Sequence, residues 1–256
     1  MSETIDKLAK SAELKRNKLQ FNLAGYAAVT MLGGAFIGFG VILISVIGGL
    51  LDPAGVPSMK IVQGLVFGVA LTMVLVGGAD LYTGNNLIMM IGRLEKRTTW
   101  LDLVRSWIAS YAGNAVGSII CAAIFFAAGL ASGATADYIE KLALYKVSPT
   151  FTELFWRGVL CNILVCMGVW GFYKVQNEAA KILVVFCCIF PFITSGFEHS
   201  IANITLFSLA ALIPGGEVGV QHFIHNLIPV TFGNAVGGAI FIGLAFWLSE
   251  RNVQKN

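Results

Sequence analysis

The chain alternates between long apolar intervals and short charged segments. Residues 19–51, 106–136 and 218–249 contain no Asp, Glu, Lys or Arg. An α-helix rises about 1.5 Å per residue, so each of these intervals can cross a hydrocarbon layer of about 30 Å as a single helix. A fourth interval, 158–173, is shorter, and its flanks extend it to roughly 151–173. The pattern predicts an all-α membrane protein.

Two further intervals are interrupted near their middle. Residues 61–91 are apolar apart from Asp80, and residues 182–213 are apolar apart from Glu198. Either interval would be longer than about 40 Å as one straight helix, and each holds a polar cluster that contains glycine. We therefore predict that both helices are broken and that the chain has six spans. The predicted spans are about 22–50, 61–91, 104–131, 151–173, 181–213 and 222–248, with the second and fifth broken.

Positive charges divide unequally between the two sides of this arrangement. With both termini on one side, that side receives 13 of the 17 Lys and Arg residues. The other side receives Lys60, Lys141, Lys146 and Arg157. Cytoplasmic loops carry the excess of Lys and Arg, so we expect a multi-pass protein of the inner or plasma membrane with both termini in the cytoplasm. Residues 1–20 would form a cytoplasmic amphipathic segment, 21–249 a single transmembrane channel domain and 250–256 a cytoplasmic tail.

Composition excludes several classes of protein. Of the 256 residues, 57% are hydrophobic and only 12% are charged, which is about half the charged share of a soluble domain. A soluble fold could not cover so much apolar surface, and a disordered chain would not contain it. The net charge of +3 is spread along the chain, so no nucleic-acid partner is expected. The sequence contains no phosphate-loop or metal-binding motif. We therefore expect that the protein is not an enzyme and that it has no cofactor and no metal site.

The sequence contains an internal repeat. The pentapeptide GNAVG occurs at residues 113–117 and again at 233–237, an offset of 120. The two interrupted intervals match more loosely at an offset of 118, with Gly78, Asp80 and Asn85 aligned to Gly196, Glu198 and Asn203. Each half would then have three spans, and because three is odd the second half must be inverted. The alternative is a chance match between Gly-rich helices that pack through small residues.

Backbone N–H and C=O groups that a break frees at membrane depth cost several kcal/mol unless they form hydrogen bonds. Such breaks occur where the backbone is buried in protein or lines a water-filled cavity, so paired breaks indicate a path between the two halves. The N-termini of half-helices at such breaks would favour an anion. The equivalent positions of Asp80 and Glu198 suggest a structural task, such as accepting hydrogen bonds from freed N–H groups or from the loops. A carboxylate in the path itself would repel an anion.

His199 and Thr83 are the polar residues that we expect to meet the permeant. An ionisable side chain inside a membrane is a functional candidate by default, and His199 has no counterpart in the first half, where Leu81 occupies the matching position. The alternative for His199 is a core histidine bound to a carbonyl group. The alternative for Thr83 is the cap of the half-helix that follows it.

Three motifs in order resemble those of the formate/nitrite transporter family, which includes formate, nitrite and hydrosulfide channels. DLYTGN at 80–85 resembles the family's (E/D)LFTGN loop, with Asp for the commoner Glu and Tyr for Phe. GFEHSIAN at 196–203 is similar to its second loop, and RGVLCNILVC at 157–166 is similar to the opening of its fourth span. The resemblance covers about residues 20 to 248.

The resemblance implies a homopentamer whose protomers have an aquaporin-like fold, each with its own pore. Two apolar constrictions would be formed by Phe67, Leu71, Leu81 and Phe192. His199 and Thr83 would face the permeant between them. A supporting polar network would contain Lys146, Asn162, Glu198 and Asn203, with Asp80 and Asn85 at the first break. Without the resemblance, Lys146 reads as an ordinary solvated loop lysine.

A bare anion in an apolar constriction faces a large desolvation cost. Formate, nitrite and hydrosulfide are conjugate bases of weak acids, so protonation would remove most of that cost. Our hypothesis is that a basic vestibule attracts the anion, His199 supplies or relays a proton, and the neutral acid crosses. In the alternative, His199 stays charged and the anion passes intact.

Three other functions remain as alternatives. An aquaporin-like channel for small neutral solutes would also have six spans and paired breaks, but its breaks carry Asn-Pro-Ala, and neither break here contains proline. A membrane enzyme would need a nucleophile, metal or cofactor motif. A structural membrane scaffold would leave the presence of His199 inside the membrane unexplained.

Overall fold

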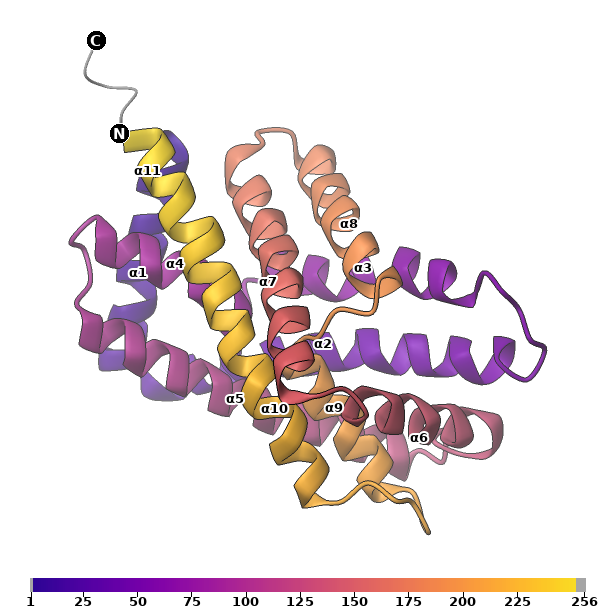
Figure 1. Cartoon of the computed structure of the whole chain (residues 1–256). Coiled ribbons are helices and arrows are strands. Elements are labelled where there is room, and N and C mark those ends of the chain that lie inside the picture. The colour runs from indigo at the N-terminus through magenta and orange to yellow at the C-terminus, as the bar shows by residue number, and fades with distance from the viewer. Residues whose placement is uncertain (1, 252–256) are drawn as a thin grey trace.

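The computed structural model describes residues 2–251, and every regular element in that range is a helix (Figure 1). Most of the predicted tail 250–256 lies outside the described residues. In chain order the helices are α1 (Glu3–Phe21), α2 (Leu23–Leu51), α3 (Met59–Val76), α4 (Tyr82–Leu94), α5 (Trp100–Ala127), α6 (Gly133–Val147), α7 (Phe151–Lys174), α8 (Glu178–Thr194), α9 (Ser200–Leu212), α10 (Val220–Val236), the π-helix η1 (Gly237–Leu244) and α11 (Ala245–Arg251). The all-helical prediction is confirmed for this range.

Five segments are long and apolar enough to cross a membrane: α2, α3, α5, α7 and the continuous stretch Val220–Glu250. The predicted span 181–213 is divided between α8, with 17 residues, and α9, with 13. The predicted second span is divided in the same way between α3 and α4. Membrane-spanning helices are therefore present, while the number six stays a prediction.

Sequence cues explain where several helices begin. Thr99 and Thr150 each accept a hydrogen bond from the backbone of the residue three positions on, and the carboxylate of that residue, Asp102 or Glu153, binds back. Such reciprocal caps satisfy N–H groups that the first helical turn leaves free. They fix the starts of α5 and α7, two of the long apolar helices.

Each half of the chain opens with a helix that is more polar than the long apolar helices after it. In the first half this is α1, whose buried face, with Ile5, Leu8 and Ala12, packs against α4. In the second half it is α6, which packs against α2 and α9. The predicted spans leave residues 132–150 unassigned, where charged residues such as Glu140 and Lys141 interrupt the apolar pattern. Each half is thus a polar helix followed by its apolar helices.

Glycines of the repeated pentapeptide let the long helices approach closely. A Cβ atom added to Gly117 on α5 would collide with the carbonyl oxygen of Met31 on α2. The matching Gly237 lies against the carbonyl of Val159 on α7 in the same way. Small residues four apart allow such backbone contact, so the pentapeptide marks equivalent helix–helix contacts in the two halves.

We expect Gly117→Ala to destabilise the fold, because α2 and α5 would have to move apart to admit the methyl group. Overpacking of this kind costs about 1–3 kcal/mol. Gly168→Ala in α7 is the matched control, since its Cβ would make only ordinary contacts of 3.4 Å or more. Unfolding midpoints in detergent check this: a lower midpoint for the first variant alone is expected, and equal midpoints would show that the α2–α5 contact is not tight.

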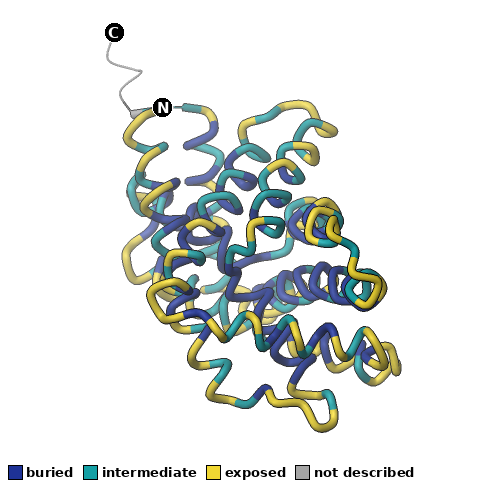
Figure 2. Tube along the Cα trace, turned by 45° about the vertical axis from the view of Figure 1, so that its right-hand side comes forward, coloured by how far each residue is buried: buried dark blue, intermediate teal, exposed yellow. Residues whose placement is uncertain are grey.

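The chain leaves the helical conformation for five residues at two equivalent places, 77–81 and 195–199. Gly78 at φ +66° and Gly196 at φ +74° adopt the left-handed conformation there, which glycine tolerates without strain. The helices that follow, α4 and α9, are the most deeply buried, since nearly every residue of 80–92 and 198–210 is enclosed. Figure 2 shows that the buried segments, in dark blue, gather in the interior of the molecule, with exposed segments toward the outside.

Candidate functional site

The two interruptions meet at His199 and Thr83. The His199 Nε2 atom lies 3.1 Å from Thr83 Oγ1, although 116 residues separate the two in sequence. Both side chains are buried. The structure therefore brings together the two residues that the sequence suggested for contact with the permeant.

The local backbone assigns the proton on the imidazole ring. His199 is the N-cap of α9, and its Nδ1 atom accepts a hydrogen bond of 3.2 Å from the N–H of Ala202. A nitrogen that accepts cannot carry a proton, so the proton of the ring lies on Nε2 and points at Thr83. Thr83 does not cap α4, because the N-cap is Leu81 and no side chain accepts there. The Nε2–H group and the Thr83 hydroxyl thus face each other at the centre.

The N-termini of α4 and α9 begin within one residue of Thr83 and His199. Unpaired N–H groups give the start of a helix a partial positive charge. Because both starts converge on one place, their fields add there. The centre suits a group with negative charge or strong acceptors.

Asp80 and Glu198 have the same kind of partners. Asp80 accepts from the amide of Asn85 and pairs with Lys15 of α1 at 2.8 Å. Glu198 accepts from the amide of Asn203 at 2.6 Å and pairs with Lys146 of α6 at 3.0 Å. The sequence suggested a structural task for the carboxylates, such as accepting hydrogen bonds from freed backbone N–H groups or from the loops. In the structure each accepts from an asparagine amide five residues later and pairs with a lysine from the first helix of its own half.

The lysine partners determine the electrostatics of the interruptions. The Lys15 and Lys146 side chains are each only 17% exposed, so they are not ordinary solvated lysines. An unpaired buried carboxylate would be strongly unfavourable, and a close ammonium group compensates it. Neither carboxylate therefore presents an uncompensated negative charge to an anion.

Two buried asparagines hold the interruptions in place, and sequence reasoning did not assign them a role. Asn114 accepts from the N–H of Tyr82 and donates to the carbonyls of Asp80 and Thr30. Its repeat partner Asn234 does the same for Ser200, Glu198 and Gly158. Each thus satisfies the backbone groups that a break leaves free. The repeated GNAVG pentapeptide was the signal that could have revealed them.

Asn162 lies apart from the Lys146–Glu198 pair with which we had grouped it. Its amide nitrogen approaches the carbonyl oxygens of Asn234 at 2.6 Å and Thr83 at 3.2 Å and the side chain of Asn86 at 2.9 Å. The residue that joins Lys146 to Asn203 is Asn226, which accepts from the Asn203 amide and donates to the Lys146 carbonyl. Asn162 therefore contacts the backbone of Thr83 and not the Glu198 carboxylate.

Three cavities lie in the region of the interruptions. The α1 cavity, of about 280 Å³, is bordered by Lys15, Lys18 and Asp80. The histidine cavity, of about 30 Å³, is bordered by His199, Phe67 and Phe192. The α6 cavity, of about 310 Å³, is bordered by Lys60, Lys141 and Lys146 and shares Lys146 with the histidine cavity. Both wide cavities therefore carry lysines.

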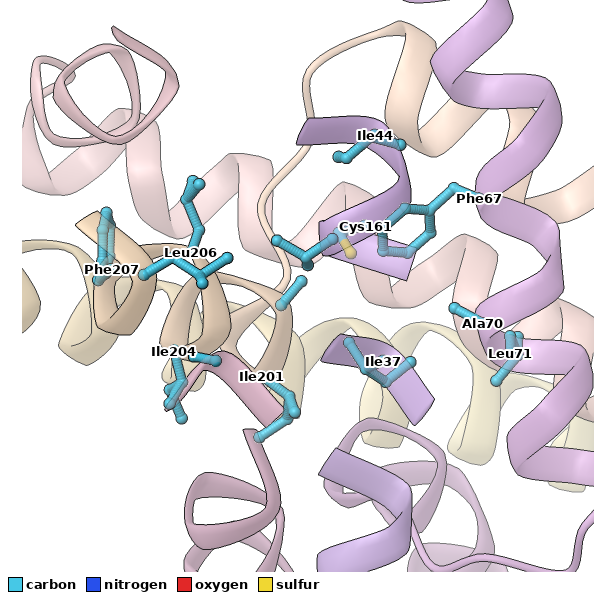
Figure 3. Close-up of a cluster of buried hydrophobic side chains, with 14 of the residues drawn as sticks. Ile37, Ile44, Phe67, Ala70, Leu71, Cys161, Ile201, Ile204, Leu206 and Phe207 are labelled. Atoms are coloured by element: carbon cyan, nitrogen blue, oxygen red, sulfur yellow. The ribbon is translucent and has the colours of Figure 1, made fainter. Parts of the chain in front are cut away.

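The four apolar residues that we expected to form constrictions lie in two groups. Phe67 and Phe192 make an edge-to-face contact with ring centroids 5.9 Å apart, next to His199. Leu71 and Leu81 both border the α1 cavity. Figure 3 shows Phe67 and Leu71 projecting from the same side of α3, as a spacing of four residues requires. The leucines thus line the α1 cavity, and the phenylalanines line the histidine cavity.

Tyr138 of α6 closes part of the α6 cavity. Its hydroxyl accepts a hydrogen bond of 2.8 Å from Gln63, which also donates to the Ile44 carbonyl. Burial raises the pKa of the Tyr138 phenol above its ordinary value, so it stays neutral at physiological pH. The phenol therefore adds no negative charge to this cavity.

Residues 2–248 match the family model described as formate/nitrite transporter. The nitrite transporter NirC of Escherichia coli is 35% identical over 99% of this chain and 94% of its own length. A probable formate transporter of Methanothermobacter thermautotrophicus is 36% identical over 96% of this chain and 95% of its own.

Solved structures give the same result. A channel described as an FNT family ion channel superimposes with a TM-score of 0.91 at 32% identity, over 97% of this chain and 99% of its own. A pentameric formate channel with formate bound gives a TM-score of 0.75 at 27% identity, over 89% of this chain and 97% of its own. All four are transporters or channels, and none is an enzyme.

Proposed function

The chain belongs to the formate/nitrite transporter family, and we propose that it conducts formate or nitrite, with hydrosulfide as a third candidate. A nitrite transporter and a probable formate transporter each match almost its whole length. The observation that carries the proposal is the buried contact between His199 and Thr83 where the two helix interruptions meet.

The proposed path runs from one wide cavity to the other through the histidine cavity. Lysines attract the anion into either wide cavity. Phe67 with Phe192, and Leu71 with Leu81, form the two apolar constrictions. Between them the permeant meets the Nε2–H group of His199 and the hydroxyl of Thr83, both of which can bind an oxygen or sulfur atom.

Proton coupling follows from the cost of moving a charge between apolar side chains. The permeant takes up a proton from water in a wide cavity and crosses as the neutral acid. A neutral ring with its proton on Nε2 fits this version: the Ala202 N–H occupies Nδ1, so the ring binds the permeant as a hydrogen-bond donor and keeps its single proton, because losing it would leave an imidazolate. In the competing version a charged imidazolium would direct an Nδ1 proton at that N–H group, and two donors would face each other.

The proposal includes the arrangement in the membrane. Helices α3 with α4, and α8 with α9, would each form one broken span, which gives six spans in two inverted halves with an aquaporin-like topology. The α1 cavity would face the cytoplasm together with both termini, as the lysine distribution favours. Five protomers would assemble, as in the pentameric relative.

A flux panel in proteoliposomes tests this function. We expect formate and nitrite to equilibrate much faster than in empty vesicles, with rates that rise as the pH falls and the acid form increases. Glycerol tests the alternative of a channel for neutral solutes and should show background rates. Fast glycerol flux together with background rates for all three anions would contradict the proposal.

A further inference from the structure

The α6 cavity carries one more positive charge than its carboxylates balance. Lys141 contacts both carboxylate oxygens of Asp52, at 2.7 and 2.8 Å, and Lys146 pairs with Glu198. Lys60, at the start of α3, has no carboxylate partner within residues 2–251. Its ammonium group lies 5.6 Å from the centre of the Tyr145 ring. Lys60 is thus the cation of this cavity that remains available to a ligand.

The rest of the cavity wall is mostly apolar. Leu142 of α6, Ile193 of α8 and Phe197 of the second interruption border it. Its volume of about 310 Å³ is roughly ten times that of the adjoining histidine cavity, at about 30 Å³. A space of about 30 Å³ admits one or two water-sized groups. A larger molecule therefore fits the α6 cavity and cannot proceed further.

We propose that the α6 cavity binds monocarboxylates whose apolar part is too large for the histidine cavity, such as aromatic acids. The carboxylate pairs with Lys60, and the ring lies against Leu142, Ile193 and Phe197. A bound acid covers the opening between the two cavities, because Leu142, Ile193 and Phe197 border both. Such acids therefore block transport from the side of the α6 cavity. This block rests on the proposed function, whereas the binding itself does not depend on it.

Isothermal titration calorimetry with benzoate tests the binding, on the full chain in lipid nanodiscs. Benzyl alcohol has a similar ring without the charge, and formate has the charge without the ring, so both should bind more weakly than benzoate. We expect Lys60→Gln to weaken benzoate binding about fivefold, the effect of one partly exposed charge pair. Lys60→Arg should retain it, and so should Lys10→Gln, since Lys10 borders neither wide cavity.

Equal affinity for benzoate and benzyl alcohol in the unaltered protein would overturn the proposal without the need for any variant. So would equal benzoate affinity in the Lys60→Gln and unaltered proteins. Flux measurements distinguish a failure of the proposed function from a failure of the proposed binding site. Proteoliposomes that move neither formate nor nitrite would refute the proposed function while calorimetry still reports on the site. Formate flux that persists under saturating benzoate would refute the block.

Discussion

Replacement of His199 by phenylalanine is expected to reduce formate and nitrite flux in proteoliposomes by at least about tenfold. The ring fills the same space, but the Nε2–H group that faces Thr83 is lost. Loss of one strong hydrogen bond to a charged group in a barrier corresponds to about 1.5–3 kcal/mol, or about 10- to 100-fold in rate. Uptake followed at several pH values provides the measurement.

His222→Phe is the matched control. His222 caps the start of α10 by accepting from the Gly219 N–H and borders neither the histidine cavity nor the two wide ones. Its flux should stay close to that of the unaltered protein. If His199→Phe conducted as fast as His222→Phe at every pH, His199 would have no role in permeation.

The second large effect is expected for Asn234→Asp, on stability. The new carboxylate keeps the acceptor for the Ser200 N–H, but it can no longer donate to the carbonyls of Gly158 and Glu198. Two buried carbonyl groups lose their donor, and a charge is placed beside them. We expect a loss of about 3 kcal/mol or more in the free energy of unfolding, measured by chemical denaturation in detergent.

Asn177→Asp is the control for the chemical change itself. Asn177 caps α8 at an exposed site by accepting from the Ala180 N–H, and Asp serves as well as Asn in that position. Its free energy of unfolding should change by less than about 0.5 kcal/mol. Comparable losses in the two variants would mean that Asn234 does not hold the interruption.

The centre of the site was predictable because its signals are local. An unpaired histidine and a threonine at interruptions of apolar intervals were sufficient to name His199 and Thr83. Phe67 and Phe192, whose contact the structure shows, were named only through the family resemblance, because a phenylalanine in an apolar stretch otherwise indicates packing. His199 and Thr83, by contrast, are unusual in their own stretches of sequence.

The partners of the two carboxylates were harder to predict because they come from distant helices. Lys15 lies 65 residues from Asp80, and Lys146 lies 52 residues from Glu198. Nothing in the sequence around Lys15 distinguishes it from the neighbouring lysines of a charged helix. The position of α6 decides the role of Lys146, and that helix has no apolar pattern strong enough to reveal it.

The measurement that tests the central claim most directly is a cryo-electron microscopy structure in lipid nanodiscs with a high concentration of nitrite. Our account predicts that both helices are interrupted at bilayer depth, at 77–81 and 195–199. It also predicts density for the anion between His199 and Thr83. Either segment running as an uninterrupted helix, or His199 facing lipid with nitrite bound elsewhere, would contradict the account.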